Sequence, residues 1–221
     1  MKRQSFTLVE MLVVVAVIAV LMGLMFPAIG MVRQNAKLKQ SQSEAKAIQT
    51  AILSFKNEYH YLPDTTTSND VVYYGSVAKS VGSTGTDKNC SDIQADGALQ
   101  TDYLDLFNAL CYNNSDPDQN YVPPAGARSL NPRKIKFLTP GKKFIGSATE
   151  RGYRDPWGRP YIIFLDTNYD GEITIPEGSG LPGNKVHGDV AVIGLGTFDY
   201  GTSDKISKAL ATPENIVTSW Q

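Results

Sequence analysis

Residues 6–32 read FTLVEMLVVVAVIAVLMGLMFPAIGMV, and Glu10 is the only charged residue among them. The residues before this segment, MKRQS, are polar and basic. A helix of this length extends about 40 Å at roughly 1.5 Å per residue, which exceeds the roughly 30 Å hydrocarbon core of a bilayer. The segment therefore predicts a membrane-spanning helix, and Lys2 and Arg3 favour a cytoplasmic N-terminus.

Two simpler interpretations of this segment stay open. A removable signal peptide would end at a small-x-small site such as Ala28-Ile29-Gly30, but its apolar stretch is normally about 7–15 residues. A plain signal anchor explains the length and leaves Glu10 without a role. An acid within an apolar span is by default a functional residue, and the alternative for Glu10 is a first-turn position favoured by the helix dipole.

The stretch Ser-Phe-Thr-Leu-Val-Glu at residues 5–10, followed by the apolar run, resembles the class III signal of type IV pilins and type II secretion pseudopilins. The resemblance implies that a prepilin peptidase removes the leader, residues 1–5, by cutting between Ser5 and Phe6, and then methylates the amine of Phe6. The family usually has Gly before the cut, where this chain has Ser5. The family also has a proline near the position of Pro27, which would kink or locally melt the helix.

The resemblance also implies how such a subunit is used. Glu10 would pair with the N-terminal amine of a neighbouring subunit, because opposite charges offset each other's burial. The implied partners are identical subunits in a helical filament, minor pseudopilins, the prepilin peptidase and the secretion-system assembly proteins. The precursor would lie in the bacterial inner membrane, with residues 6–32 as the transmembrane and filament-core half of the helix and the globular domain in the periplasm.

Residues 33–62 are predicted to form the amphipathic half of the same helix. Apolar residues recur there at the steps expected for one helix face: Leu38, Ala45, Ile48, Ile52, Phe55 and Tyr59. The helix is predicted to end near His60, because Pro63 disfavours helical backbone at the residue before it.

Residues 63–130 are predicted to be a variable loop region, rich in Ser, Thr, Gly and Asp near its start and containing one short helix near Leu99–Leu110. Cys90 and Cys111 both fall in this region. In a secreted protein such a pair is interpreted as a disulfide, whereas in the cytosol both residues would be free thiols. The expected periplasmic location favours the disulfide.

Residues 131–221 are predicted to form a small antiparallel sheet with the long helix lying across it. The strand candidates are Lys134–Leu138, Lys142–Ile145, Pro160–Leu165 and Val190–Leu195. A long helix followed by short strands predicts an α+β fold, as in the pilin-like architecture, whose hydrophobic helix half protrudes. The stretches at 131–133, 155–161 and 214–220 resemble the C-terminal domain of major type II secretion pseudopilins.

A calcium loop is predicted at Asp166-Thr-Asn-Tyr-Asp-Gly-Glu-Ile. Oxygen donors fall at the first, third and fifth positions (Asp166, Asn168 and Asp170), and a Gly follows at the sixth for the sharp turn. Glu172 would donate through its backbone carbonyl, and Glu177 would close the twelfth position. The alternative is a hairpin turn in which Asp and Asn side chains bond their own backbone. Major pseudopilins bind Ca²⁺ in their C-terminal region, which favours the metal site.

The net charge and the absence of known catalytic motifs argue against several classes of function. The formal net charge of -1 argues against general nucleic-acid binding, since no basic excess exists to release counterions from phosphate. The sequence has two His and no Gly-x-Ser-x-Gly, Walker or dinucleotide motif, so we expect no enzyme. The expected function is a structural subunit of a type II secretion pseudopilus. The alternatives are a type IV pilin or minor pilin for adhesion, motility or DNA uptake, and a membrane-anchored binding domain that does not polymerise.

Overall fold

The computed structural model describes residues 7–64, 69–76, 80–81, 87–94, 101–111, 130–139, 154–177, 182–199 and 204–220. The chain divides into two compact units, Met1–Lys39 and Gln40–Gln221. The sequence predicted the boundary between the apolar and amphipathic halves of the helix between residues 32 and 33. The division between the two units falls several residues later, between Lys39 and Gln40.

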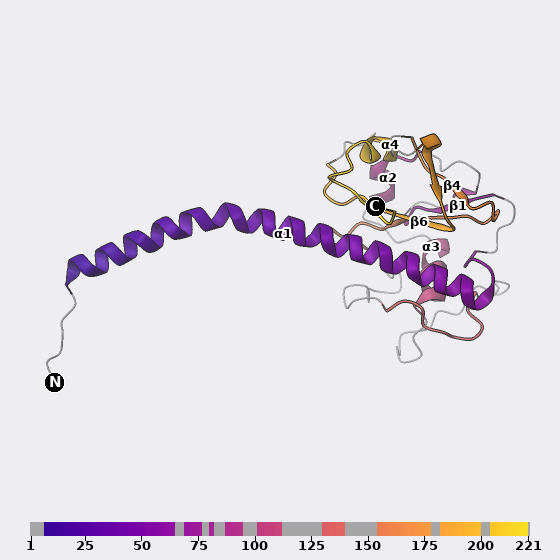
Figure 1. Ribbon diagram of the computed structural model, residues 1–221, viewed down its shortest axis with the longest axis horizontal. Coiled ribbons are helices and arrows are strands. Elements are labelled where there is room, and N and C mark those ends of the chain that lie inside the picture. Colours follow the sequence, from indigo (N-terminus) through magenta and orange to yellow (C-terminus); the bar gives the residue numbers. More distant parts are fainter. Residues whose placement is uncertain are drawn as a thin grey trace. The chain divides into compact units, whose positions relative to one another are not determined.

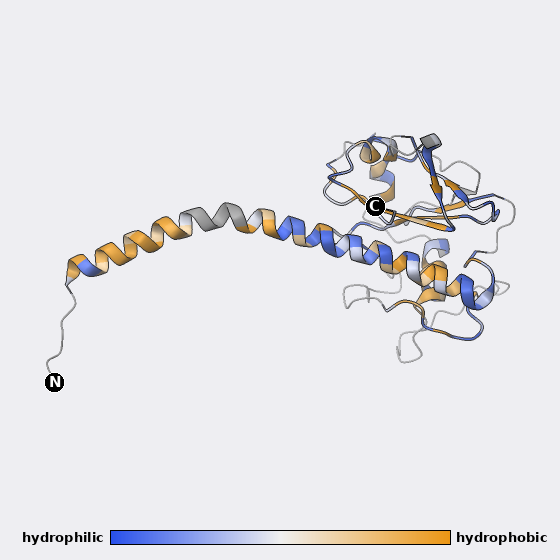
Figure 2. Cartoon of the chain, in the orientation of Figure 1, coloured by the Kyte–Doolittle hydropathy of each residue, from blue (hydrophilic) through white to orange (hydrophobic). Residues whose placement is uncertain are grey.

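The long helix α1 covers Leu8–Tyr59 and contributes to both units (Figure 1). Its end at Tyr59 confirms the predicted stop, and His60 takes a left-handed backbone with φ 63° shortly before Pro63. In the first unit the side chains along residues 8–22 are apolar around the whole helix, apart from Glu10 (Figure 2). Pro27 lies within α1, which is helical on both sides of it.

The second unit is built on a five-stranded antiparallel sheet in the order β2-β1-β3-β6-β7. Its central strands β3 and β6 are uninterrupted apolar runs buried on both faces, as expected for strands covered on two sides. The strands are β1 (Val71–Tyr73), β2 (Ser80–Val81), β3 (Ile162–Leu165), β6 (Val190–Gly194) and β7 (Val217–Thr218).

One face of this sheet packs against the second half of α1. Ala45, Ile48, Ile52 and Phe55 are all fully buried, at the helical spacing predicted. Two polar contacts accompany this packing: Gln49 Nε2 donates to the Val190 carbonyl oxygen over 2.9 Å, and the Tyr161 hydroxyl lies 3.0 Å from Ser41 Oγ. A side chain at position 194 would approach Tyr161 and Ser41 to about 3 Å, so Gly194 permits this close approach.

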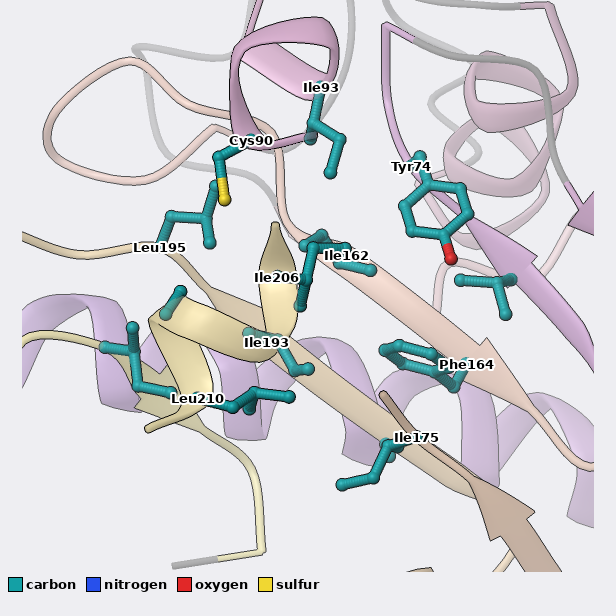
Figure 3. Packing of buried hydrophobic residues seen from close by; sticks show 14 of the residues in the cluster. Tyr74, Cys90, Ile93, Ile162, Phe164, Ile175, Ile193, Leu195, Ile206 and Leu210 are labelled. Carbon is teal, nitrogen blue, oxygen red and sulfur yellow. The ribbon is translucent and has the colours of Figure 1, made fainter. Parts of the chain in front are cut away.

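The opposite face carries a second core. Alternate residues of β1, β3 and β6 point into it, and the β4–β5 hairpin and α4 contribute further apolar side chains. Figure 3 shows Ile162, Phe164 and Ile193 of the sheet gathered with Ile206 and Leu210 of α4 in this core. The remaining elements are β4 (Glu172–Thr174), β5 (Lys185–His187), η2 (Pro182–Asn184), α2 (Cys90–Gln94), α3 (Thr101–Leu110) and α4 (Ile206–Leu210).

The α+β class is confirmed, and the individual strand predictions met different outcomes. The candidates at 160–165 and 190–195 became β3 and β6, and the short helix became α3. The prediction of a strand at Lys134–Leu138 is wrong: this segment is irregular, and the Phe137 and Leu138 amides donate to the Leu110 carbonyl at the end of α3. The candidate at 142–145 lies outside the described residues.

The boundary between loop region and sheet domain also differs from the prediction. The sequence placed the whole sheet within 131–221, but β1 and β2 come from the 63–130 segment. β1 pairs with β3 so that Val71 lies opposite Leu165 and Val72 opposite Phe164. The loop region therefore supplies an inner strand of the sheet, and this pairing positions the acidic site described below.

Candidate functional site

The first candidate site is the start of α1. Ser5 and Phe6, the residues flanking the predicted cut, lie outside the described residues. Glu10 is in the first helical turn, where its Oε2 accepts hydrogen bonds from the Thr7 amide and the Thr7 hydroxyl, each over 2.8 Å. The Glu10 amide in turn donates to Thr7 Oγ1 over 3.3 Å. Thr7 and Glu10 thus form a capping box, which satisfies amides that the helix start leaves unpaired.

The helix around Glu10 presents apolar side chains without cover from the rest of the chain. Leu8, Val9 and Met11 are 80%, 67% and 50% exposed. Large exposed apolar surfaces mark sites where a protein meets another protein or a membrane. Glu10 therefore sits beside a surface whose side chains need an external partner.

Within the part of the chain that the structure describes, no helix combines the length and apolar character that a membrane crossing requires.

The second candidate site is the turn between β3 and β4. Asp166 follows β3 directly and is fully buried. Its Oδ2 accepts a hydrogen bond from the Gly171 amide over 2.8 Å, and its Oδ1 accepts a longer one of 3.3 Å from the Asp170 amide. Gly171 takes φ 81°, a left-handed conformation that favours glycine, so its residue type allows the chain to turn back toward Asp166.

Asn168 and Asp170 complete this turn by bonding the backbone two residues ahead. Asn168 Oδ1 accepts from the Asp170 amide over 2.9 Å, and Asp170 Oδ1 accepts from the Glu172 amide over 2.8 Å. The Asn168 side-chain amide also donates to Asp170 Oδ2 over 3.0 Å. The predicted turn is therefore present, with the three oxygen-bearing side chains Asp166, Asn168 and Asp170 gathered on it.

The two glutamates of the predicted loop are placed differently. The Glu172 side chain forms an ion pair with Lys185 on β5, and its Oε1 lies 3.7 Å from His187 Nδ1. Glu177 lies beyond β4 and is exposed. Among the described residues, no three His, Cys, Asp or Glu side chains converge closely enough to hold a metal by themselves.

Sequence reasoning missed Asp70, which precedes β1. It is 5% exposed, and its Oδ1 has no hydrogen-bond partner. Burial raises the pKa of the Asp70 carboxyl group to about 6, with smaller contributions from the negative charges of Asp166 and Asp170, against a lowering by a hydrogen bond from the Thr174 amide. The available signal was an acid directly before the apolar run Val71-Val72-Tyr73, which only becomes informative once that run is recognised as an inner strand.

The structure differs from the prediction of a disulfide. Cys90 and Cys111 are both free thiols. Cys90 begins α2 and points into the second core beside Leu195 (Figure 3), whereas Cys111 follows α3 and is not part of that core. Burial raises the pKa of each thiol to about 12, which keeps both protonated and unreactive near neutral pH. Each cysteine is thus placed by the packing of its own helix.

Comparison with protein families matches residues 1–26 to the prokaryotic N-terminal methylation motif. The matched segment contains Ser5, Phe6 and Glu10. No curated protein and no solved structure matches the chain. The match covers the start of the chain alone, and it supports the coarser of the sequence-based expectations: this chain carries the signal of type IV pilin-like proteins, which are made as membrane-anchored precursors, processed by prepilin peptidase.

Proposed function

We propose that this chain is a structural subunit of a type II secretion pseudopilus, processed between Ser5 and Phe6 and polymerised in the periplasm to support protein export. The role is structural and not enzymatic. The observation that supports it most is the methylation motif at residues 1–26, whose acid, Glu10, lies in the first turn of an uncovered apolar helix. Filament assembly would cover that helix with the same helix of neighbouring subunits, together with minor pseudopilins.

The capping box gives Glu10 two separable roles. Within one subunit its Oε2 is held by Thr7, which stabilises the helix start. Between subunits, its negative charge would pair with the methylated amine of Phe6 of a neighbour. A Gln at this position preserves an oxygen acceptor for the capping box and removes the charge.

Glu10→Gln and Glu10→Ala therefore test the assembly role directly. If charge pairing drives assembly, both variants accumulate as processed monomers, whereas Thr7→Val, which removes the side-chain cap and leaves the charge, still assembles. The readout is filament yield by electron microscopy, with the mass of the N-terminal peptide as a check on processing. Assembly of Glu10→Gln at the level of the unmodified chain would limit Glu10 to helix capping.

The same mass measurement tests processing. Expression with the cognate prepilin peptidase is expected to give a chain that begins with N-methylated Phe6, despite Ser5 in place of the usual Gly. A chain that begins at Met1 would favour the simple membrane anchor, and cleavage near Gly30 would favour a removed signal peptide. Loss of protein export with intact surface pili, after deletion of the gene, separates a pseudopilin from a type IV pilin or minor pilin.

We further propose that the turn at Asp166, Asn168 and Asp170 binds Ca²⁺. A hard cation of this size takes six to eight oxygen ligands, including amide, backbone and water oxygens as well as carboxylates. The three side chains are already gathered by hydrogen bonds to the turn. Glu172 would contribute through its backbone oxygen, since its side chain is paired with Lys185, and Glu177 would close the twelfth position.

A further inference from the structure

A cluster of basic residues begins where the exposed apolar stretch of α1 ends. Met31 and Val32, the last residues of that stretch, are 70% and 66% exposed. The following turns, still within the first unit, carry three exposed basic residues that we call the basic collar: Arg33, Lys37 and Lys39. The sequence has no acid between Glu10 and Glu44, so the basic collar gives this part of the helix a net positive charge.

The basic collar occupies two faces of the helix. Arg33 and Lys37 share a face with the exposed apolar residue Ile29, since each follows the previous one by a single step of i,i+4. Lys39 lies about 120° around the helix from Arg33, at roughly 3.6 residues per turn, and above Val32. One neighbouring helix covers one face, whereas lipid surrounds a helix on every side. The distribution of these charges therefore fits a lipid environment better than a single protein surface.

The spacing of charges along α1 corresponds to the layers of a bilayer. Glu10 and Arg33 are about 35 Å apart along the helix axis, at roughly 1.5 Å per residue. The hydrocarbon layer is roughly 30 Å thick, and the headgroup layers add about 5–8 Å on each side. Arg33 to Lys39 extends over a further 9 Å or so, about the thickness of one headgroup layer. A helix with Glu10 in one headgroup layer therefore brings the basic collar into the other.

The position of the basic collar carries a cost that needs a compensating contact. Basic residues that flank an apolar helix favour the cytoplasmic side of the membrane. The prepilin signal implies that residues 1–5 lie on that side, so the basic collar lies on the opposite side and acts against this orientation. Anionic headgroups attract Lys and Arg beside the membrane and would offset the cost. A plain hydrophobic anchor has no use for these three charges.

We propose that the basic collar docks onto the phosphates of anionic phospholipids, and so sets the depth of the precursor in the membrane. This inference rests on the membrane-anchored precursor of the proposed function and not on the pseudopilus. The guanidinium of Arg33 can donate two parallel hydrogen bonds to one phosphate, whereas Lys37 and Lys39 act as point charges. The long stems of these side chains cover apolar surface while their charged ends reach the headgroups.

The test is native mass spectrometry of the full chain in detergent micelles, titrated with phosphatidylglycerol or with phosphatidylcholine of the same acyl chains. Each Lys or Arg near an anionic surface strengthens binding about fivefold. The unmodified chain should therefore bind phosphatidylglycerol at least about twentyfold more tightly than phosphatidylcholine. Arg33→Gln/Lys37→Gln/Lys39→Gln should reduce that preference at least about tenfold. Arg33→Lys/Lys37→Arg/Lys39→Arg keeps the charges and should keep most of the preference, which separates loss of charge from a folding defect.

The matched control is Lys46→Gln/Lys136→Gln/Lys205→Gln, which removes the same charge from exposed residues of the second unit and should keep the preference. Equal binding of the two lipids by the unmodified chain, or an equal loss in both Gln variants, would overturn the docking. An unchanged lipid preference in the collar variant, together with loss of its filaments, would assign the basic collar to a neighbouring subunit instead. Lipid binding is measured without assembly proteins, so a chain that never polymerises can still give the expected lipid result, and failure of the proposed function is seen separately in filament yield.

Discussion

The two halves of α1 have similar apolar residues in opposite environments. Val14 and Ile18 in the first unit are 51% and 45% exposed, whereas Ile48 and Ile52 in the second unit are fully buried. The second half carries its apolar residues on one face of the helix, and that face packs against one face of the sheet. Its apolar side chains are therefore covered by the same chain. The first half is apolar around its whole circumference, and no single sheet face can cover it. The hydrophobicity of both halves thus indicates that each has apolar surface to bury. The distribution of the apolar residues, on one face or around the whole helix, indicates whether the sheet of the same chain can bury it.

Among the substitutions that test this difference between the two halves, Phe55→Ala is expected to change the free energy of unfolding most. Phe55 is fully buried, with ring centroids 4.6 Å from Tyr59 and 5.3 Å from Phe137. Its truncation should lower the free energy of unfolding of the second unit by about 3–5 kcal/mol. Val14→Ala in the first unit is the control and should change it by less than about 0.5 kcal/mol. Urea unfolding of the full chain in micelles measures both, and equal losses would mean that the two halves are not separate in stability.

A second prediction concerns the pH dependence of stability, which we expect to depend on Asp155 in the second unit and not on Glu10 in the first. Asp155 is 5% exposed; its Oδ1 accepts the Trp157 and Arg159 amides, and its Oδ2 has no partner. Burial raises its pKa from 3.8 to about 6, despite those donors, and the charge of Glu44 adds to the rise. The folded state therefore binds this proton more tightly than the unfolded state, so the stabilisation is full below pH 4 and is lost as pH rises through 6.

The unmodified chain should consequently lose roughly 3 kcal/mol through this one group between about pH 4 and 6, relative to Asp155→Asn, which does not titrate. The measurement is the difference between the two unfolding free energies at several pH values, which cancels the contributions of all other groups. Glu10→Gln, in the first unit, is expected to leave the same pH profile unchanged. A difference that stays constant across the window would contradict the raised pKa of Asp155 in the folded state.

The smallest effect is expected from Tyr161→Phe, which alters only the polar contact between α1 and the sheet. The Tyr161 hydroxyl lies 2.8 Å from Glu44 Oε2 and 3.0 Å from the fully buried Ser41 Oγ. Removing it leaves Ser41 without this partner, so the loss should be about 1–3 kcal/mol. Tyr61→Phe, whose hydroxyl makes one exposed bond of 3.3 Å to the Leu130 carbonyl, is the control with a change below about 0.5 kcal/mol. Equal changes would show that burial of Ser41 does not matter.

Much of the second unit could be predicted because its signals are local. The end of α1 follows from Pro63, and β3 and β6 follow from apolar runs between turn residues. The segment at 134–138 had a strand-like pattern and failed, since its Phe137 and Leu138 amides bond to the end of α3 instead of to a strand. A short apolar pattern fits either outcome, and only the available partners decide between them.

The candidate sites divide in the same way. Glu10 was identified from the sequence because an acid in an apolar run is conspicuous by itself, and the turn at Asp166–Asp170 was identified because its donors are neighbours in the chain. Asp70 was missed since it is separated from Asp166 by most of the loop region. The free state of Cys90 and Cys111 was missed for a related reason: cysteine count and spacing do not show which core each helix packs into.

The sequence by itself determined that an apolar helix start with Glu10 in its first turn precedes an α+β unit, and that three oxygen donors meet in one turn. These properties follow from composition, period and turn chemistry over a few residues. Only the tertiary structure decided that β1 joins the sheet and that Asp70 lies opposite Asp166. The physical reason is that strand register and burial depend on pairing between distant segments, which no local pattern specifies.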